Sequence, residues 1–180
     1  MTPKTDSSLW AEGVSAGLYA AGSRHVVYVP DNPLSLVLRT LAHAYPDVRT
    51  TIATREEEAF GMAAGLYLGG ARPTVMLQSS GLGNSLNALT SLFVPYQIPA
   101  LVIVSMRGDA GEWNAAQVPM GQAVASIAAA IGLPAATVDD ASMVAAMVER
   151  VGRTAFGTRQ AGLCLLPRRL IAMPPAAGGR

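Results

Sequence analysis

The stretch Ala-Leu-Val-Ile-Val-Ser at residues 100–105 carries no charge and is rich in β-branched side chains. It follows Pro99 and leads into the polar segment Arg107-Gly108-Asp109. A short, continuous apolar run with such flanks is typical of a strand that is buried on both faces of a sheet. Strands of this kind occur almost only in parallel sheets that have helices on both sides. The stretch therefore predicts an α/β domain.

Similar apolar runs alternate with helical patterns along the rest of the chain. The other five predicted strands are residues 25–29, 48–52, 74–77, 135–138 and 163–166. Helical patterns occupy residues 7–21, 34–44, the region around Glu57, 85–94, 121–131 and 141–156. This alternation predicts a doubly wound, mainly parallel six-stranded sheet with helices on both faces and right-handed crossovers.

Length and composition fit one domain with a closely packed aliphatic core. The 180 residues are 51% hydrophobic but only 6% aromatic and 14% charged, with a formal net charge of +1. We expect one domain over residues 1–172 and a flexible tail over residues 173–180, where Pro and Gly are frequent. The absence of a basic run argues against a nucleic-acid partner. Low charge with high hydrophobicity predicts that another subunit covers some apolar surface.

The single cysteine and two histidines offer little for metal or redox chemistry. Cys164 lies in a predicted strand, so we expect a buried structural thiol, and one cysteine forms no intrachain disulfide. His25 and His43 stand apart from any cluster, and no metal ligands are predicted in this chain. The polar start, Met1 to Ser8, does not resemble a signal peptide, and the apolar runs are too short to span a bilayer. These features predict a soluble, cytoplasmic protein.

Polar and Gly-rich segments follow four of the predicted strands. They are residues 30–33, 54–57, 78–84 and 105–109. Ligands of open α/β sheets bind beyond the carboxyl ends of the strands. Since the carboxyl ends of parallel strands share one edge, we expect these four segments to form a site there.

Three acids begin the helical pattern Arg55-Glu56-Glu57-Glu58-Ala59-Phe60-Gly61-Met62-Ala63-Ala64-Gly65. Helical spacing from Glu57 leads to a face with Gly61, Ala64, Gly65 and Leu68. Small residues let another group approach that face closely, and poor solvation would raise the pKa of the Glu57 carboxyl. Alternatively, the acids only complement the helix dipole.

Two further segments admit a structural and a functional interpretation. Ser79-Ser80-Gly81-Leu82-Gly83-Asn84-Ser85 is either a tight turn with a helix cap or a cradle of backbone N–H groups. It matches neither the Walker loop nor the dinucleotide fingerprint. Arg107 either clamps an anionic group of a ligand or pairs with Asp109 or Glu112. The polar segment 111–119, which carries Trp113, is a lid or a contact loop.

Three stretches carry a resemblance that covers residues 26–166. Residues 55–65 resemble the glutamate helix of thiamine diphosphate-dependent decarboxylases, residues 78–89 resemble their Gly-rich turn, and residues 99–105 resemble the strand that follows. The chain resembles the pyrimidine-binding domain of that family, in particular the alpha subunits of two-subunit sulfopyruvate decarboxylases and the matching half of phosphonopyruvate decarboxylases.

The resemblance implies roles for residues at the predicted site. In the family one glutamate contacts N1′ of the aminopyrimidine ring and activates the cofactor; this role falls on Glu57, with Glu56 and Glu58 as fallbacks. The cofactor pocket would also include Pro30, Asn32, Ser80, Gly81 and Gly83. The substrate would contact Gln78, Ser79, Asn84 and Arg107, with Arg107 holding an anionic tail.

One departure from the family implies a partner. The second domain of these enzymes holds Mg²⁺ and the diphosphate through a Gly-Asp-Gly motif with a later Asn. Here Gly108-Asp109-Ala110 breaks that motif, and Asn114 follows too soon. A separate beta subunit is therefore implied to hold Mg²⁺ and the diphosphate, which makes the protein a hetero-oligomer with its active site at the subunit interface.

The implied function is that of the alpha subunit of a thiamine diphosphate-dependent carboxy-lyase. The implied substrate is a small anionic 2-oxo acid such as sulfopyruvate or phosphonopyruvate. Three alternatives remain open at this stage: a carboligase half that uses the same cofactor, a non-catalytic structural subunit of such a complex, and a flavodoxin-like domain that binds a nucleotide alone.

Overall fold

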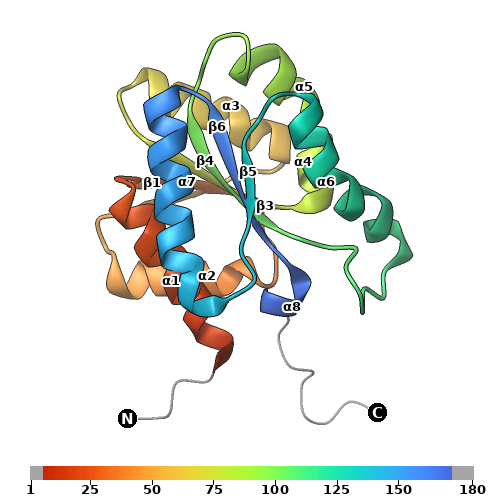
Figure 1. The fold of residues 1–180 in the computed structure, drawn as a ribbon. Coiled ribbons are helices and arrows are strands. Elements are labelled where there is room, and N and C mark those ends of the chain that lie inside the picture. Colours follow the sequence, from red (N-terminus) through yellow and green to blue (C-terminus); the bar gives the residue numbers. More distant parts are fainter. Residues whose placement is uncertain (1–5, 172–180) are drawn as a thin grey trace.

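The six strands of the described part of the chain lie in one parallel sheet (Figure 1). The computed structural model describes residues 6–171, so the predicted tail, residues 173–180, lies outside the described residues. The strands are β1 (His25–Tyr28), β2 (Arg49–Ile52), β3 (Pro73–Gln78), β4 (Ala100–Ser105), β5 (Ala135–Thr137) and β6 (Ala161–Leu166). Their order is β2-β1-β3-β4-β6-β5, and every neighbouring pair is parallel.

Helical segments connect the strands. In chain order they are α1 (Asp6–Ala20), α2 (Leu34–Ala44), α3 (Glu56–Leu68), α4 (Ser79–Asn84), α5 (Leu86–Ala88), the π-helix η1 (Leu89–Phe93), η2 (Ala115–Gln117), α6 (Val118–Ala130), η3 (Ala141–Met143), α7 (Val144–Thr158) and α8 (Arg168–Ile171). Parallel strands run in the same direction, so after each strand the chain must cross back to the same end of the sheet. The helical segments lie in these crossovers.

Each face of the sheet has its own apolar core. Side chains alternate between the faces, so Val102 and Val104 of β4 pack with α3, α4 and α6, whereas Leu101 and Ile103 pack with α1, α2 and α7. The central strands β4 and β6 are buried along their whole length. At the edge, all four residues of β2 are exposed. The sheet is therefore covered on both faces but open at the β2 edge.

The predicted fold class is confirmed, with one local difference. The Gly-rich segment after β3 is itself a short helix, α4, rather than a turn leading into a helix over residues 85–94. Leu82 and Ser79 are buried there, so packing overrides the weak helix propensity of glycine. No helix within residues 6–171 has the length and apolarity that crossing a membrane requires.

Cys164 is fully buried in β6, which agrees with the prediction of a structural thiol. Burial raises the pKa of this thiol from its ordinary value of 9.0 to about 12. The neutral thiol is therefore the favoured form in the fold, and the thiolate that reacts with oxidants and disulfides is suppressed.

We expect Cys164 to react with a chromogenic disulfide at pH 8 roughly a thousand times more slowly in the native protein than in urea, because the folded state holds far less thiolate. Its raised pKa also contributes stability that is present below pH 9 and is lost as the pH rises toward about 12. Thiol kinetics and urea unfolding at several pH values measure both effects. The variant Cys164→Ala lacks this group, and an equal loss of its stability over that range would contradict the assignment.

Candidate functional site

The carboxyl ends of β1, β3 and β4 gather the predicted site residues. The strand order reverses beside β1, since β2 lies on one side of it and β3 on the other. Such a reversal opens a crevice beyond the strand ends, where ligands of α/β proteins bind. Asp31 follows β1, Ser79 follows β3 and Arg107 follows β4, so all three lie at this edge.

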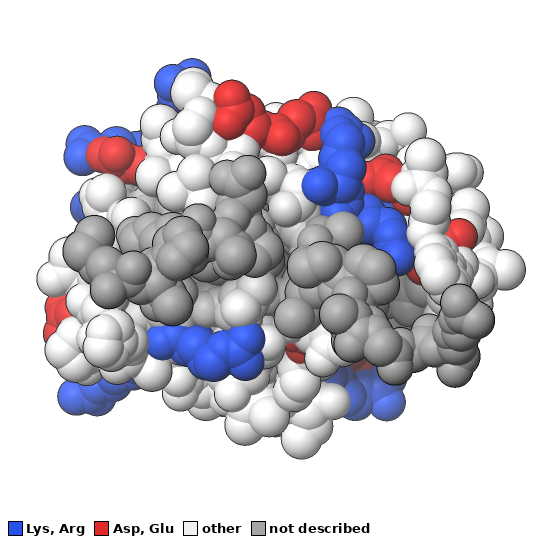
Figure 2. Space-filling view, turned by 90° about the horizontal axis from the view of Figure 1, so that it is seen from below, with Lys and Arg blue, Asp and Glu red and all other residues white. Residues whose placement is uncertain are grey.

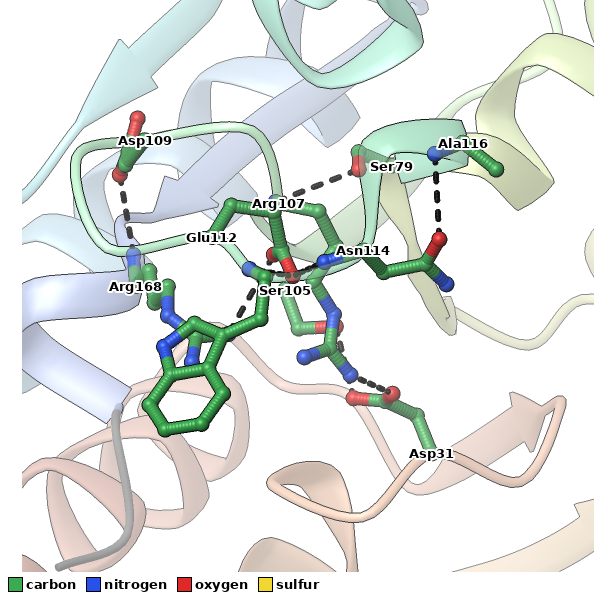
Figure 3. A network of polar contacts seen from close by, with 10 residues as sticks. Asp31, Ser79, Ser105, Arg107, Asp109, Glu112, Asn114, Ala116 and Arg168 are labelled. Carbon is green, nitrogen blue, oxygen red and sulfur yellow. Dashed lines mark hydrogen bonds and ion pairs between the residues drawn. The ribbon is translucent and has the colours of Figure 1, made fainter. Parts of the chain in front are cut away.

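A buried network of polar contacts joins these strand ends (Figure 3). Arg107 Nη2 donates to Asp31 Oδ1 over 2.8 Å, and Ser105 Oγ donates to Asp31 Oδ2 over 2.8 Å. The backbone N–H of Arg107 donates to Ser79 Oγ over 3.3 Å. Asp31 is almost fully buried and Arg107 is largely so. Arg107 thus pairs with Asp31, and not with Asp109 or Glu112 as its surface alternative predicted.

The network leaves polar groups without partners. Arg107 Nε and Gln117 Oε1 are both buried, and neither has a hydrogen-bond partner within the described residues. Buried polar atoms of folded proteins nearly always have a partner, so each exception needs an explanation. Asp31 holds the guanidinium through Nη2, and Nε–H is a further donor without a partner within the described residues.

Close backbone approach sets the position of Arg107. A Cβ atom on Gly121 of α6 would overlap the carbonyl of Arg107, and one on Gly108 would lie 2.8 Å from the carbonyl oxygen of Val118. Gly108 also has a φ of +81°, which disfavours any side chain. These two glycines let the start of α6 lie directly against the end of β4.

The three acids at the start of α3 have three different environments. The carboxylate of Glu58 accepts hydrogen bonds from the backbone N–H and the hydroxyl of Thr54, at 2.7 and 2.6 Å. These bonds lower the pKa of Glu58, the hydroxyl contributing most, and they stabilise the helix start as in a capping box. Glu58 is therefore an anionic cap and not a group that holds a proton.

Glu56 and Glu57 point in different directions. Glu56 lies against α4: a Cβ atom on Gly81 would be 2.6 Å from its Oε1, and Asn84 Nδ2 donates to its Oε2 over 3.3 Å. Glu57 Oε1 instead accepts from Arg55 Nε over 2.6 Å, and its side chain is 40% exposed. The other oxygen, Glu57 Oε2, is buried and has no partner within the described residues.

The other predicted site residues divide into two groups. Ser79 and Gly81 are buried within α4, and Gln78, Ser80 and Gly83 are partly buried beside them. A Cβ atom on Gly83 would lie 2.8 Å from Met120 Sδ, so α4 is held between α3 and α6. Pro30 and Asn32 are exposed after β1. The structure brings Ser79 together with Arg107, and Gly81 and Asn84 together with Glu56.

Three residues of the site had no role assigned to them from the sequence. Asp31 lies in a segment expected at this edge, but its pairing with Arg107 joins residues far apart in the chain. Ser105 ended a predicted strand and began a segment expected at the site but had no role of its own, and Gln117 lay in the segment interpreted as a lid or contact loop. An aspartate shortly after one strand and an arginine shortly after another is the one signal that the sequence offered.

On the face seen in Figure 2, arginine side chains lie in separate groups, some of them beside acidic side chains, rather than in one continuous basic surface. Within residues 6–171, no group of three or more His, Cys, Asp or Glu side chains could hold a metal ion.

Residues 10–124 match the model of the family described as thiamine pyrophosphate enzyme, N-terminal TPP binding domain. This match confirms the resemblance drawn from residues 55–65, 78–89 and 99–105.

Curated relatives agree with that match. The chain is 45% identical over 131 residues to the sulfopyruvate decarboxylase subunit alpha of Methanothermobacter thermautotrophicus, a match that covers 73% of this chain and 77% of the relative. It is 40% identical to the subunit of the same name from Methanococcus maripaludis, over 69% of this chain and 74% of the relative. It is 43% identical to the phosphonopyruvate decarboxylase of Streptomyces viridochromogenes, over 57% of this chain but only 25% of that longer relative.

A solved structure has the same fold. The 2-oxoglutarate:ferredoxin oxidoreductase from Magnetococcus marinus superposes with a TM-score of 0.76 at 16% identity. The match covers 90% of this chain and 29% of that one, so the whole domain has a counterpart within a larger protein.

The close contact at Arg107 predicts a specific sensitivity to an added methyl group. We expect Gly121→Ala to lower the free energy of unfolding by about 1–3 kcal/mol, because the new Cβ overlaps a backbone carbonyl and the site edge must shift. Gly157→Ala in α7 is the matched control, since nothing lies within 4 Å of its added Cβ. That variant should gain up to about 1 kcal/mol. Urea unfolding compares the two, and equal stabilities would contradict the contact.

Proposed function

Because the chain belongs to the thiamine pyrophosphate enzyme N-terminal domain family, we propose that it is the alpha subunit of a thiamine diphosphate-dependent decarboxylase that acts on a small anionic 2-oxo acid. Sulfopyruvate and phosphonopyruvate are the proposed substrate types. The observation that carries the proposal is the placement of Glu56 beside α4 at the carboxyl edge of the sheet, in a chain 45% identical to a sulfopyruvate decarboxylase subunit alpha.

The residues present fit the cofactor in two respects. Glu57 Oε2 is a buried carboxylate oxygen without a partner within the described residues, and Glu56 lies against α4 where Gly81 has no side chain. An aminopyrimidine ring needs a carboxylate at one ring nitrogen and close backbone approach around it. Glu56 or Glu57, together with Pro30, Asn32, Ser80, Gly81 and Gly83, would hold the ring. When bound, thiamine diphosphate supplies the electron sink that allows carbon dioxide to leave a 2-oxo acid.

The chain's own contribution to the reaction is to hold a proton at the ring nitrogen. The sequence nominated Glu57 for this task, and Glu57 stays a prediction. The contacts favour Glu56, because its carboxylate faces Gly81 and Asn84 whereas Glu57 Oε1 is paired with the exposed Arg55. In a site closed by a partner, water is excluded from this carboxylate, which keeps the shared proton in place.

Arg107 is the proposed anchor for the anionic tail of the substrate. It lies at the same edge, Asp31 fixes its orientation, and its buried Nε–H is unpartnered. Sulfonate and phosphonate groups match a guanidinium well because their oxygens accept two donors at once. Gln78, Ser79 and Asn84 are the proposed uncharged contacts of the substrate.

A beta subunit is the proposed partner, and it would hold the diphosphate and Mg²⁺. Two observations support it. The matched relatives of similar length are named alpha subunits. The phosphonopyruvate decarboxylase is longer, and the part of it outside the match is about three times as long as the matched part. The outer face of α3 and the edge strand β2 also expose large apolar side chains, Leu68 and Ile52, beside the open positions Gly61 and Gly65.

Glutamine substitutions separate the two candidate glutamates. With the co-expressed beta subunit, Mg²⁺ and thiamine diphosphate, we expect Glu56→Gln to reduce kcat for carbon dioxide release by roughly two to four orders of magnitude, as for loss of a general acid/base. Glu58→Gln is the control and should keep activity within about threefold, since an amide still caps the helix. A larger loss in Glu57→Gln would return the role to Glu57. Full activity in both variants would show a non-catalytic subunit.

A lysine at position 107 tests the anion anchor. We expect Arg107→Lys to lower kcat/KM for sulfopyruvate or phosphonopyruvate by roughly 10–100-fold, because a bidentate charged contact is lost. Pyruvate has no anionic tail, so its kcat/KM should change much less. Steady-state kinetics on both acids gives the ratio. An equal loss on the two substrates would mean that Arg107 only supports the fold through Asp31.

A further inference from the structure

Trp113 is the most exposed large apolar side chain within the described residues. It is 90% exposed, whereas the chain's other tryptophan, Trp10, is 1% exposed in the core beneath α1. Exposing a whole indole to water forgoes a large apolar burial, since aromatic side chains of this kind bury about 150–250 Å² each. Single exposed apolar residues are common, so exposure alone carries no conclusion.

The side chain of Glu112 holds the backbone on both sides of Trp113. The carboxylate of Glu112 is only 5% exposed, and its Oε1 accepts the N–H groups of Trp113 and Asn114 at 3.0 and 3.1 Å. Its Oε2 accepts from Arg168 Nη1 over 3.3 Å. Glu112 therefore turns inward and fixes the two peptide groups on either side of the indole-bearing Cα.

Both ends of this segment are also tied down. Asp109 Oδ2 accepts the backbone N–H of Arg168 over 3.1 Å, which joins the start of the segment to α8 (Figure 3). Asn114 Oδ1 accepts the N–H of Ala116 over 3.1 Å and caps η2 at the other end. The hydrogen bond from Asn114 is the main cause of the lowered pKa of Glu112, so its charge persists at neutral pH. These bonds tie the backbone of the segment at both ends and at Trp113 itself.

A rigid, exposed tryptophan is the typical anchor of a protein interface. Tryptophan is enriched among the few residues that carry most binding energy, and a backbone that is already hydrogen-bonded in place loses little conformational entropy on docking. We propose that Trp113 is the docking anchor by which this chain binds the beta subunit, the polypeptide that completes the active site. This inference rests on the proposed function.

The position of the segment that carries Trp113 favours the beta subunit, rather than a second copy of this chain, as the partner. The segment begins where β4 ends, so it continues the edge that carries Arg107, Asp31 and Ser79. An active site shared between two polypeptides has its interface at that edge. The match covers only 26% and 25% of two longer relatives, so most of each of those proteins lies outside it.

The test compares two exposed aromatic residues in the complex with the co-expressed beta subunit. We expect Trp113→Ala to weaken association at least roughly 30-fold, as for an interface hot spot. Tyr96→Ala is the matched control: Tyr96 is 69% exposed but precedes β4, at the opposite edge of the sheet, and its affinity should stay within about threefold. Calorimetry or sedimentation of the purified subunits measures both. Trp113→Phe should recover most of the affinity.

Quenching of tryptophan fluorescence by acrylamide gives a second readout. In the free chain the exposed Trp113 is quenched and the buried Trp10 is not; the beta subunit, in a form without tryptophan, should protect Trp113. Unchanged quenching in a complex, or equal affinities of Trp113→Ala and wild type, would overturn the inference while leaving the proposed function intact. If the wild-type chain itself neither binds the beta subunit nor releases carbon dioxide with it, the proposed function fails and the inference fails with it.

Discussion

The ion pair between Arg107 and Asp31 is the interaction on which the geometry of this edge depends. β3 lies between β1 and β4, so the pair reaches across the carboxyl end of β3 and joins the segments after its two neighbours. A buried carboxylate is costly unless its oxygens are satisfied, and here Arg107 and Ser105 each supply a donor. Removal of either partner would leave a buried charge unpaired. The ion pair therefore holds the carboxyl ends of β1, β3 and β4 in one arrangement.

Glycines let the layers come close enough for that arrangement to form. α4 starts directly beneath the ion pair, and its Gly81 leaves room for the side chain of Glu56 from α3. On the other side, Gly121 lets α6 press against the backbone of Arg107. The acidic helix and the arginine therefore approach the same short helix from two directions. The small volume of these glycines, rather than additional polar contacts, determines how closely the acidic helix and the arginine can lie.

The sequence predicts the fold well because burial dominates it. Runs such as residues 100–105 and 161–166 are buried on both faces, and continuous apolar runs are the signal that parallel strands leave in a sequence. The helical state of α4 was not predictable, since glycine disfavours helices and only packing against Glu56 and Met120 compensates. The same limit applies to the site. Neighbouring residues on a helix point about 100° apart, so one residue decides whether a glutamate faces α4 or Arg55. The partner of Arg107 was likewise hidden, because contact with Asp31 depends on strand order.

The described chain has the features of one half of a site. Glu56 lies beside α4 and Asp31 orients the guanidinium of Arg107, yet Glu57 Oε2, Arg107 Nε and Gln117 Oε1 have no partner within the described residues. A stable fold tolerates such atoms where another molecule completes them. The braced Trp113 adds an apolar anchor close to where that molecule would dock. In the proposed assembly, chemistry would be linked to docking, because the second polypeptide would exclude water from the glutamate that holds the proton. On this view, the unsatisfied groups of the single chain and its exposed indole are two consequences of the same division.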